Sequence, residues 1–173
     1  MTKAEIISAL KNSYINFDNT IEALSDADLI CAPPEKWTAA QQHDHLCRST
    51  KPLILATRLP HFLLRVIFGK ANRPGRTYTE LVEKYLMKLQ QGYKAKGSYI
   101  PPVIHADQRH FLTRELTRNI SSICKNLDKF SEEDLDKFIL PHPLFGKLTM
   151  REMMYFTIYH ALHHENIVKG YFA

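Results

Sequence analysis

Residues 149–169 read TMREMMYFTIYHALHHENIVK, a run that points to an all-helical fold. It opens with a capping box, in which the Thr149 hydroxyl accepts from the third helical amide and Glu152 reaches back. Apolar residues then recur at helical spacing as far as Lys169, and Gly170 follows as a C-terminal stop. We therefore predict a long amphipathic helix over this run.

Three further long helices are predicted upstream from apolar residues that recur every three or four positions. They cover residues 3–24, 38–50 and 106–130. The second also begins with a capping box, Thr38 to Gln41, and Pro52 is expected to kink or stop it within one turn. Shorter helical pieces are expected over 53–76 and 79–91, and a loop over 138–148.

The prediction for the whole chain is an all-α fold. We expect an antiparallel four-helix bundle, with additional short helices between the second and third long helices, as a single domain over residues 1–173. With 45% hydrophobic and 24% charged residues, the composition excludes a disordered chain. Six Gly and nine Pro argue against a turn-rich all-β protein.

The net charge and the cysteines indicate which partners and which cellular compartment to expect. The net charge of +5 is a mild excess that suits a small anionic ligand better than dedicated nucleic-acid binding. Three cysteines without a CxxC pair are expected to be reduced. No long apolar run and no signal peptide is evident, so we expect a cytoplasmic protein with no membrane partner.

The histidines carry the strongest chemical signal. His160 and His164 are four residues apart, so they lie about 40° apart on one helix face and can chelate one divalent ion. With nine His in the chain, chance gives about half a pair at this spacing, so the spacing alone is weak evidence. The two rings continue an apolar stripe, however, and inward imidazoles need hydrogen bonds or a metal.

A third ligand must come from another helix. His43 and His45 are both candidates in the second helix, where they point to nearly opposite sides, and periodicity does not choose between them. A protease of the His-Glu-x-x-His type is excluded because Ala161 follows His160. The inverted pattern is also excluded, since His163 stands where it needs Glu.

Two stretches resemble the DinB/YfiT-like superfamily: KWTAAQQHDHL at 36–46, and HPLFGKLT at 142–149 leading into YHALHH at 159–164. That family has a Trp-Ser/Thr start to its second helix, with a His eight residues after the Trp. It also has Gly-x-Leu-Thr/Ser before a last helix that carries His-x-x-x-His. The resemblance selects His45 over His43, and it assigns His160 and His164 as the other ligands.

The same resemblance implies a four-helix bundle with a three-His metal site, often in a homodimer. Relatives include thiol-dependent transferases, isomerases and metal-dependent hydrolases. Their last helix often has Gln three residues after its final His, where this chain has Ile167. We accordingly expect zinc or nickel, and a metal-dependent hydrolase or thiol-dependent transferase. Its small-molecule substrate would be an anionic low-molecular-weight thiol or a similar compound.

Three neutral histidines leave a metal with an open position, where it can activate bound water or a thiol. Asp44, His163 and Glu165 are candidates for supporting groups, with ordinary packing or solvation as the alternative.

Two other functions stay open. The chain could be a non-catalytic dimerisation or binding module of the same fold. It could instead bind an anionic partner through the basic 48–76 segment, although a solvated face balanced by acidic residues elsewhere is the favoured explanation of that segment. Its basic residues, with no acidic ones between them, are Arg48, Lys51, Arg58, Arg65, Lys70, Arg73 and Arg76.

Overall fold

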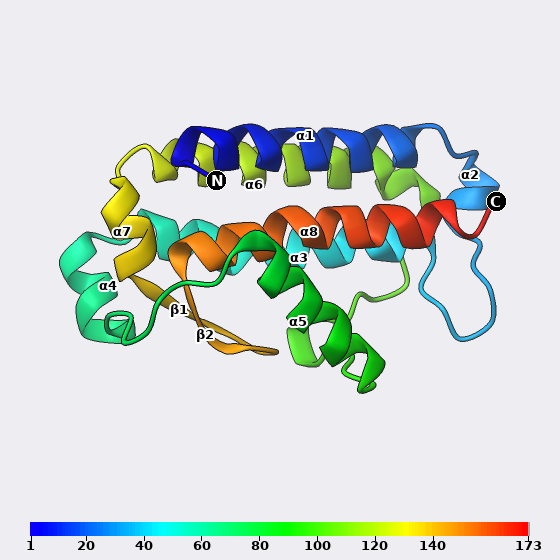
Figure 1. The fold of residues 1–173 in the computed structure, drawn as a ribbon. Helices are drawn as coiled ribbons and strands as arrows, with labels where there is room; N and C mark the ends of the chain where they lie inside the picture. The colour runs from blue at the N-terminus through cyan, green and yellow to red at the C-terminus, as the bar shows by residue number, and fades with distance from the viewer. Residues whose placement is uncertain (173) are drawn as a thin grey trace.

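The computed structural model describes residues 1–172, which form a bundle of four long helices (Figure 1). Around the bundle, α3 packs on α6, α6 on α1, α1 on α8, and α8 on α3. The long helices are α1 (Lys3–Glu22), α3 (Ala39–Arg58), α6 (Arg109–Leu127) and α8 (Met150–Lys169). The predicted all-α four-helix bundle is confirmed.

The direction of the helices decides which residues meet. In Figure 1, α1 and α8 run one way and α3 and α6 run the other. The bundle is therefore antiparallel between α1 and α6 and between α3 and α8, and parallel between the other two pairs. Because α3 and α8 are antiparallel, the first turns of α3 lie beside the last turns of α8.

Shorter elements connect the long helices. As expected, several fall between the second and third long helices, namely α4 (His61–Phe68), α5 (Tyr78–Gln90) and the 3-10 turns η1 (Gly97–Tyr99) and η2 (Ala106–Gln108). In addition, α2 (Asp26–Leu29) lies between the first and second long helices, and α7 (Glu132–Lys137) between the third and fourth. Both predicted capping boxes form: Thr38 accepts from the Gln41 amide at 3.2 Å, and Thr149 accepts from the Glu152 amide at 3.1 Å.

Pro52 was expected either to kink or to stop the second long helix, with an end near residue 50; the expected end is wrong, because α3 continues through Pro52 to Arg58. Pro52 lies on the exposed side of α3, while Leu53 and Thr57 next to it are buried. A proline inside a helix removes one backbone hydrogen bond. Burial of the inner face against α6 offsets that loss.

The predicted loop over 138–148 is also corrected. It forms an antiparallel hairpin of β1 (Ile139–His142) and β2 (Gly146–Thr149), in which Ile139 pairs with Thr149. Gly146 takes a φ of 75°, a conformation that side chains with a Cβ rarely adopt. The hairpin lies beside the start of α8 (Figure 1).

The core follows the predicted apolar faces. Along α1, the buried residues are Ile6, Leu10, Tyr14, Phe17 and Ile21. On α6, the apolar residues that recur at helical spacing are buried except for Phe111, which is 56% exposed; the buried ones are Leu112, Leu116, Ile120, Ile123 and Leu127. Across residues 1–172, no helix combines the length and apolarity that a membrane crossing requires.

Candidate metal centre

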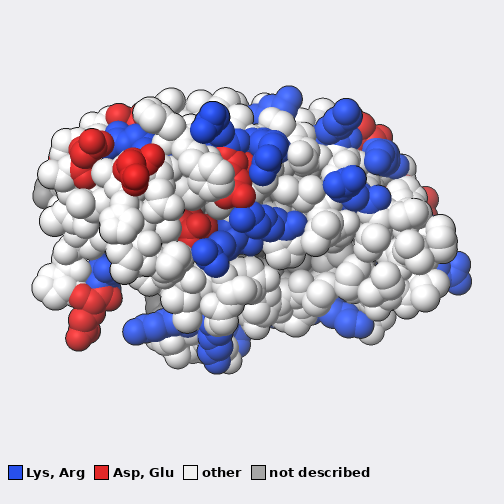
Figure 2. All heavy atoms as spheres, turned by 180° about the vertical axis from the view of Figure 1, so that it is seen from behind, with Lys and Arg blue, Asp and Glu red and all other residues white. Residues whose placement is uncertain are grey.

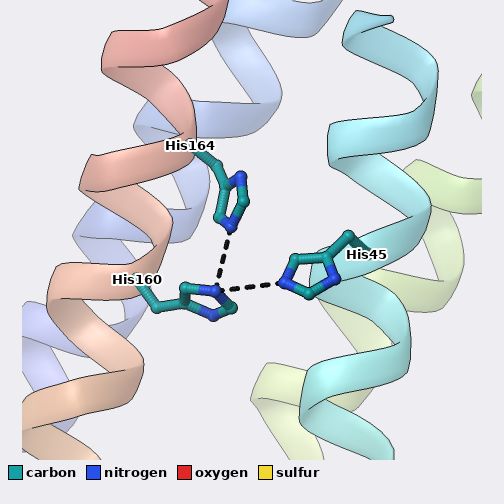
Figure 3. Close-up of side chains that lie close together, drawn as sticks. All are labelled: His45, His160 and His164. Carbon is teal, nitrogen blue, oxygen red and sulfur yellow. Dashed lines mark hydrogen bonds between the residues drawn. The ribbon is translucent and has the colours of Figure 1, made fainter. Parts of the chain in front are cut away.

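Three histidines from two helices meet inside the bundle. His45 comes from α3, and His160 and His164 from successive turns of α8 (Figure 3). The Nε2 atom of His160 lies 3.2 Å from that of His45 and 2.9 Å from that of His164. All three residues are buried, at 5–6% exposure. The antiparallel contact of α3 and α8 thus brings together residues 115 or more positions apart in sequence.

The outer nitrogens of two of the rings are held by oxygen acceptors. His45 Nδ1 donates to the Tyr99 carbonyl at 2.7 Å, and His164 Nδ1 donates to Gln42 Oε1 at 2.5 Å. Because these oxygens only accept, each Nδ1 carries the hydrogen, and each Nε2 keeps its lone pair for the centre of the site.

The orientation of the Gln42 amide is itself fixed. Its Nε2 donates to the Tyr171 hydroxyl at 3.2 Å, and that hydroxyl donates to the Trp37 carbonyl at 2.9 Å. The amide oxygen must therefore face His164. Partners of this kind fix the ring orientation and raise the basicity of histidine ligands.

The arrangement fits a metal ion. Zinc bonds of about 2.0–2.1 Å in a tetrahedron place ligand nitrogens about 3.3 Å apart, close to the 3.2 and 2.9 Å found here. Without an ion, the lone pairs of His45 and His164 both face His160 Nε2, which can donate only one hydrogen. A divalent cation would satisfy all three nitrogens at once.

The protonation states of the three imidazoles also favour metal binding. Burial lowers the pKa of His160 and of His164 well below the ordinary value, and the neighbouring imidazoles lower both further. Burial also lowers the pKa of His45, against the opposing effect of its hydrogen bond to Tyr99. The three rings are thus neutral near pH 7, the form in which histidine binds a metal.

The alternative ligand, His43, points away from the centre. Its Nε2 lies 3.5 Å from Asp18 Oδ1, and its ring packs edge-on against Phe17 at a centroid distance of 5.4 Å. Neither ring nitrogen has a hydrogen-bond partner within residues 1–172. Burial lowers the pKa of His43 to about 3 and raises that of Asp18 to about 7. The structure therefore brings His45, and not His43, to the other two rings.

The candidate supporting residues lie elsewhere. Asp44 pairs with Arg48, and Glu165 pairs with Lys169 at 2.5 Å. His163 is half-buried, with its ring 5.1 Å from that of His164. The groups that hold the rings of His45 and His164 were not predicted from the sequence. They are Gln42, the Tyr99 carbonyl and, through Gln42, Tyr171. No spacing in the sequence assigns these groups: Gln42 lies one turn before His45, but the ring that it holds is that of His164 on α8.

A cavity of about 190 Å³ adjoins the histidines, and His45 and His160 form part of its wall. Apolar and aromatic side chains make up most of the remaining wall. A ligand in the cavity would therefore reach the histidines while shielded from water on several sides.

The basic 48–76 segment is not an unbalanced patch. Within the described chain, four of its seven basic residues form ion pairs. The pairs are Arg48–Asp44, Lys51–Glu115, Arg73–Glu152 and Arg76–Glu152. On the face seen in Figure 2, acidic groups lie among the basic ones. Asp44 lies one turn before Arg48 on α3 itself, whereas Glu115 on α6 and Glu152 on α8 are distant in sequence, so the local sequence does not reveal them.

Comparison with known proteins places the chain among helical bundles of this kind. A sequence model of the DinB superfamily matches residues 9–168. YfiT from Bacillus subtilis, a probable metal-dependent hydrolase with an unusual four-helix bundle topology, superposes with a TM-score of 0.59 at 15% identity, over 97% of this chain and 84% of that one. No curated protein matches the sequence.

A second solved structure shows the same fold. It is the colibactin self-resistance protein ClbS in complex with a dsDNA, with a TM-score of 0.57 at 17% identity, over 98% of this chain and 94% of that one. At these identities the likeness extends to the fold only.

Proposed function

The chain belongs to the DinB superfamily, and from its three converging imidazoles we propose that it binds one divalent metal ion through His45, His160 and His164. Zinc and nickel are the preferred ions, since both accept neutral imidazole ligands. The observation that carries the proposal is the meeting of three Nε2 atoms, two of which keep their lone pairs because their Nδ1 hydrogens are already donated.

We further propose that the site is catalytic, in a metal-dependent hydrolase or a thiol-dependent transferase. A metal held by three histidines keeps an open position, where it lowers the pKa of bound water or a thiol. The cavity beside His45 and His160 supports this proposal because it gives a small molecule access to that position. An anionic low-molecular-weight thiol is one candidate substrate.

Different residues of the chain would orient the metal ligands and shield the reaction from water. Gln42 and the Tyr99 carbonyl hold two rings in the orientation that a metal requires. The aromatic wall of the cavity would shield the reacting groups from water on one side. We propose that the whole chain acts as one domain, in the cytoplasm and as a homodimer.

A thermal melt with and without EDTA tests the metal proposal. A ligand at about 100 times its Kd stabilises the folded chain by about 2.7 kcal/mol, which corresponds to a rise in Tm of about 5–10 °C at this size. We expect EDTA to remove that rise and added zinc or nickel to restore it. His110→Ala, on the exposed side of α6, should melt like the wild type.

An activity screen tests the catalytic proposal. Ester substrates and thiol acceptors would be assayed with the metal-loaded and EDTA-treated protein. Turnover that EDTA abolishes and metal restores would support an enzyme. If EDTA changes neither the melt nor any activity, the chain is a metal-free binding module instead.

A further inference from the structure

The cavity beside the histidines has the size of a single ring. It lies between α3, α5, the loop that follows α5, the β hairpin and α8. A dry apolar cavity of about 150 Å³ is enough to hold benzene. At about 190 Å³, this cavity has room for one six-membered ring and a short substituent.

Aromatic side chains line one wall, starting at a ligand histidine. The Phe156 ring stacks on His160 at a centroid distance of 4.8 Å and an angle of 26°. His142 and Tyr85 then pack edge-on against Phe156, at 4.3 and 5.3 Å. Aromatic rings favour such edge-to-face and offset contacts, so a ligand ring would find both geometries here.

The charge at the cavity has one sign. Of the residues that line it, only Lys94 and Lys96 are permanently charged, and no aspartate or glutamate is among them. Both lysines are exposed, whereas His45 and His160 are buried. The two lysine residues therefore lie at the solvent-exposed side of the cavity, and the two imidazoles at its buried side.

The loop that carries these lysines is tied to the ligand helix. The Tyr99 carbonyl accepts from His45, and the Ser98 carbonyl accepts from Arg48 Nη1 at 3.2 Å. An anion held by Lys94 or Lys96 is thus positioned relative to α3.

We propose that this cavity binds an arylalkanoate, a compound with one aromatic ring and a carboxylate on a short chain. The ring lies against Phe156 and Tyr85, the carboxylate meets Lys94 and Lys96, and any reactive substituent on the far side of the ring faces His45 and His160. The placement of the reactive substituent rests on the proposed metal function, whereas the binding of the ring and of the carboxylate does not.

Calorimetric titration with 3-phenylpropanoate tests the proposal, with 3-phenyl-1-propanol as its uncharged counterpart. Both probes would be titrated into zinc-loaded and EDTA-treated protein. We expect the acid to bind about tenfold more tightly than the alcohol, because only the acid forms charge-assisted hydrogen bonds with the lysines. The preference should survive EDTA.

Two variants locate the contacts. The double substitution Lys94→Gln/Lys96→Gln should weaken binding of the acid about tenfold and leave that of the alcohol unchanged. Its matched control, Lys125→Gln/Lys129→Gln on exposed positions near the end of α6, should bind like the wild type. Equal affinity for acid and alcohol, or no response to loss of the lysines, would overturn the proposal.

The outcomes separate this inference from the metal proposal. Binding of the acid in a protein that takes up no metal would support the cavity assignment and contradict the metal site. A protein that binds metal but neither probe would contradict the cavity assignment alone. Acid binding that disappears with EDTA and ignores the lysines would mean that the metal holds the carboxylate, which also overturns the inference.

Discussion

Replacing Gln42 with alanine should weaken metal binding without touching a ligand. Gln42 is 4% exposed, and its Oε1 is the acceptor for the Nδ1 hydrogen of His164. Its removal leaves a buried N–H group without a partner, at a cost of about 1–3 kcal/mol. It also frees the ring to turn or to move its hydrogen to Nε2, where that hydrogen would block the metal. Loss of such partners typically lowers metal affinity by about 10–100-fold.

The assay is a competition titration of zinc against a chromophoric chelator. Gln42→Glu keeps an oxygen acceptor at the same reach, so it should retain most of the affinity. Gln41→Ala is the neighbouring control, because Gln41 bonds to Thr38 and to the Pro102 carbonyl and contacts no histidine ligand. Far-UV circular dichroism would verify that each variant is folded.

The result that refutes this reasoning is an affinity of Gln42→Ala within twofold of the wild type. The hydrogen bond would then have no part in orienting His164. An equal loss in Gln41→Ala would also refute it, since the effect would come from the start of α3 as a whole.

Three further predictions follow from buried polar groups. Burial raises the pKa of Asp18 from 3.8 to about 7, so between these values the folded chain holds a proton that the unfolded chain has released. The contribution of Asp18 to stability should therefore fall as pH rises from about 4 to 7, opposite in sign to that of the buried histidines, whose lowered pKa values make stability rise with pH. Asp18→Asn should accordingly make stability rise more steeply with pH than in the wild type, as measured by urea titrations across this range; an unchanged pH dependence would contradict it. Glu152→Gln should cost about 2–4 kcal/mol in urea unfolding, because it leaves Arg73 without a buried charge partner, whereas the exposed Glu133→Gln should cost under about 0.5. Tyr171→Phe should lower zinc affinity less than Gln42→Ala does, about threefold, since it only frees the amide to rotate; an equal or larger loss would contradict this.

Local sequence signals predicted the helices well because their causes are local. The capping boxes at Thr38 and Thr149 involve residues three positions apart, and both formed. The predicted helix end at Pro52 was wrong because the sequence shows the backbone hydrogen bond that a proline removes. It does not show the packing of α3 on α6 that offsets this loss. The β hairpin was missed because its strands span four residues each and its turn has no standard two-residue signal.

In the candidate site, too, the sequence predicted the features with local causes and missed those that depend on tertiary packing. The pairing of His160 with His164 depends on helical periodicity alone, so the sequence shows it. The choice of His45 over His43 depends on how α3 is rotated against α8, and only the family resemblance supplied it. Gln42 and the Tyr99 carbonyl could not be assigned, because hydrogen bonds between distant segments leave no spacing pattern in the chain.

The acidic partners of the basic segment were hidden for a similar reason. Glu115 and Glu152 lie far along the chain from Lys51 and Arg73 and meet them only in the folded protein. Counting charges along residues 48–76 therefore overstated how basic that surface is.

Elemental analysis of the purified protein tests the metal site most directly. The wild type, dialysed against zinc or nickel and then against metal-free buffer, should retain about one ion per chain, as three histidine ligands predict. His160→Ala should retain almost none, and His110→Ala should match the wild type. Equal metal content in the His160→Ala variant and the wild type would show that these imidazoles do not hold the ion.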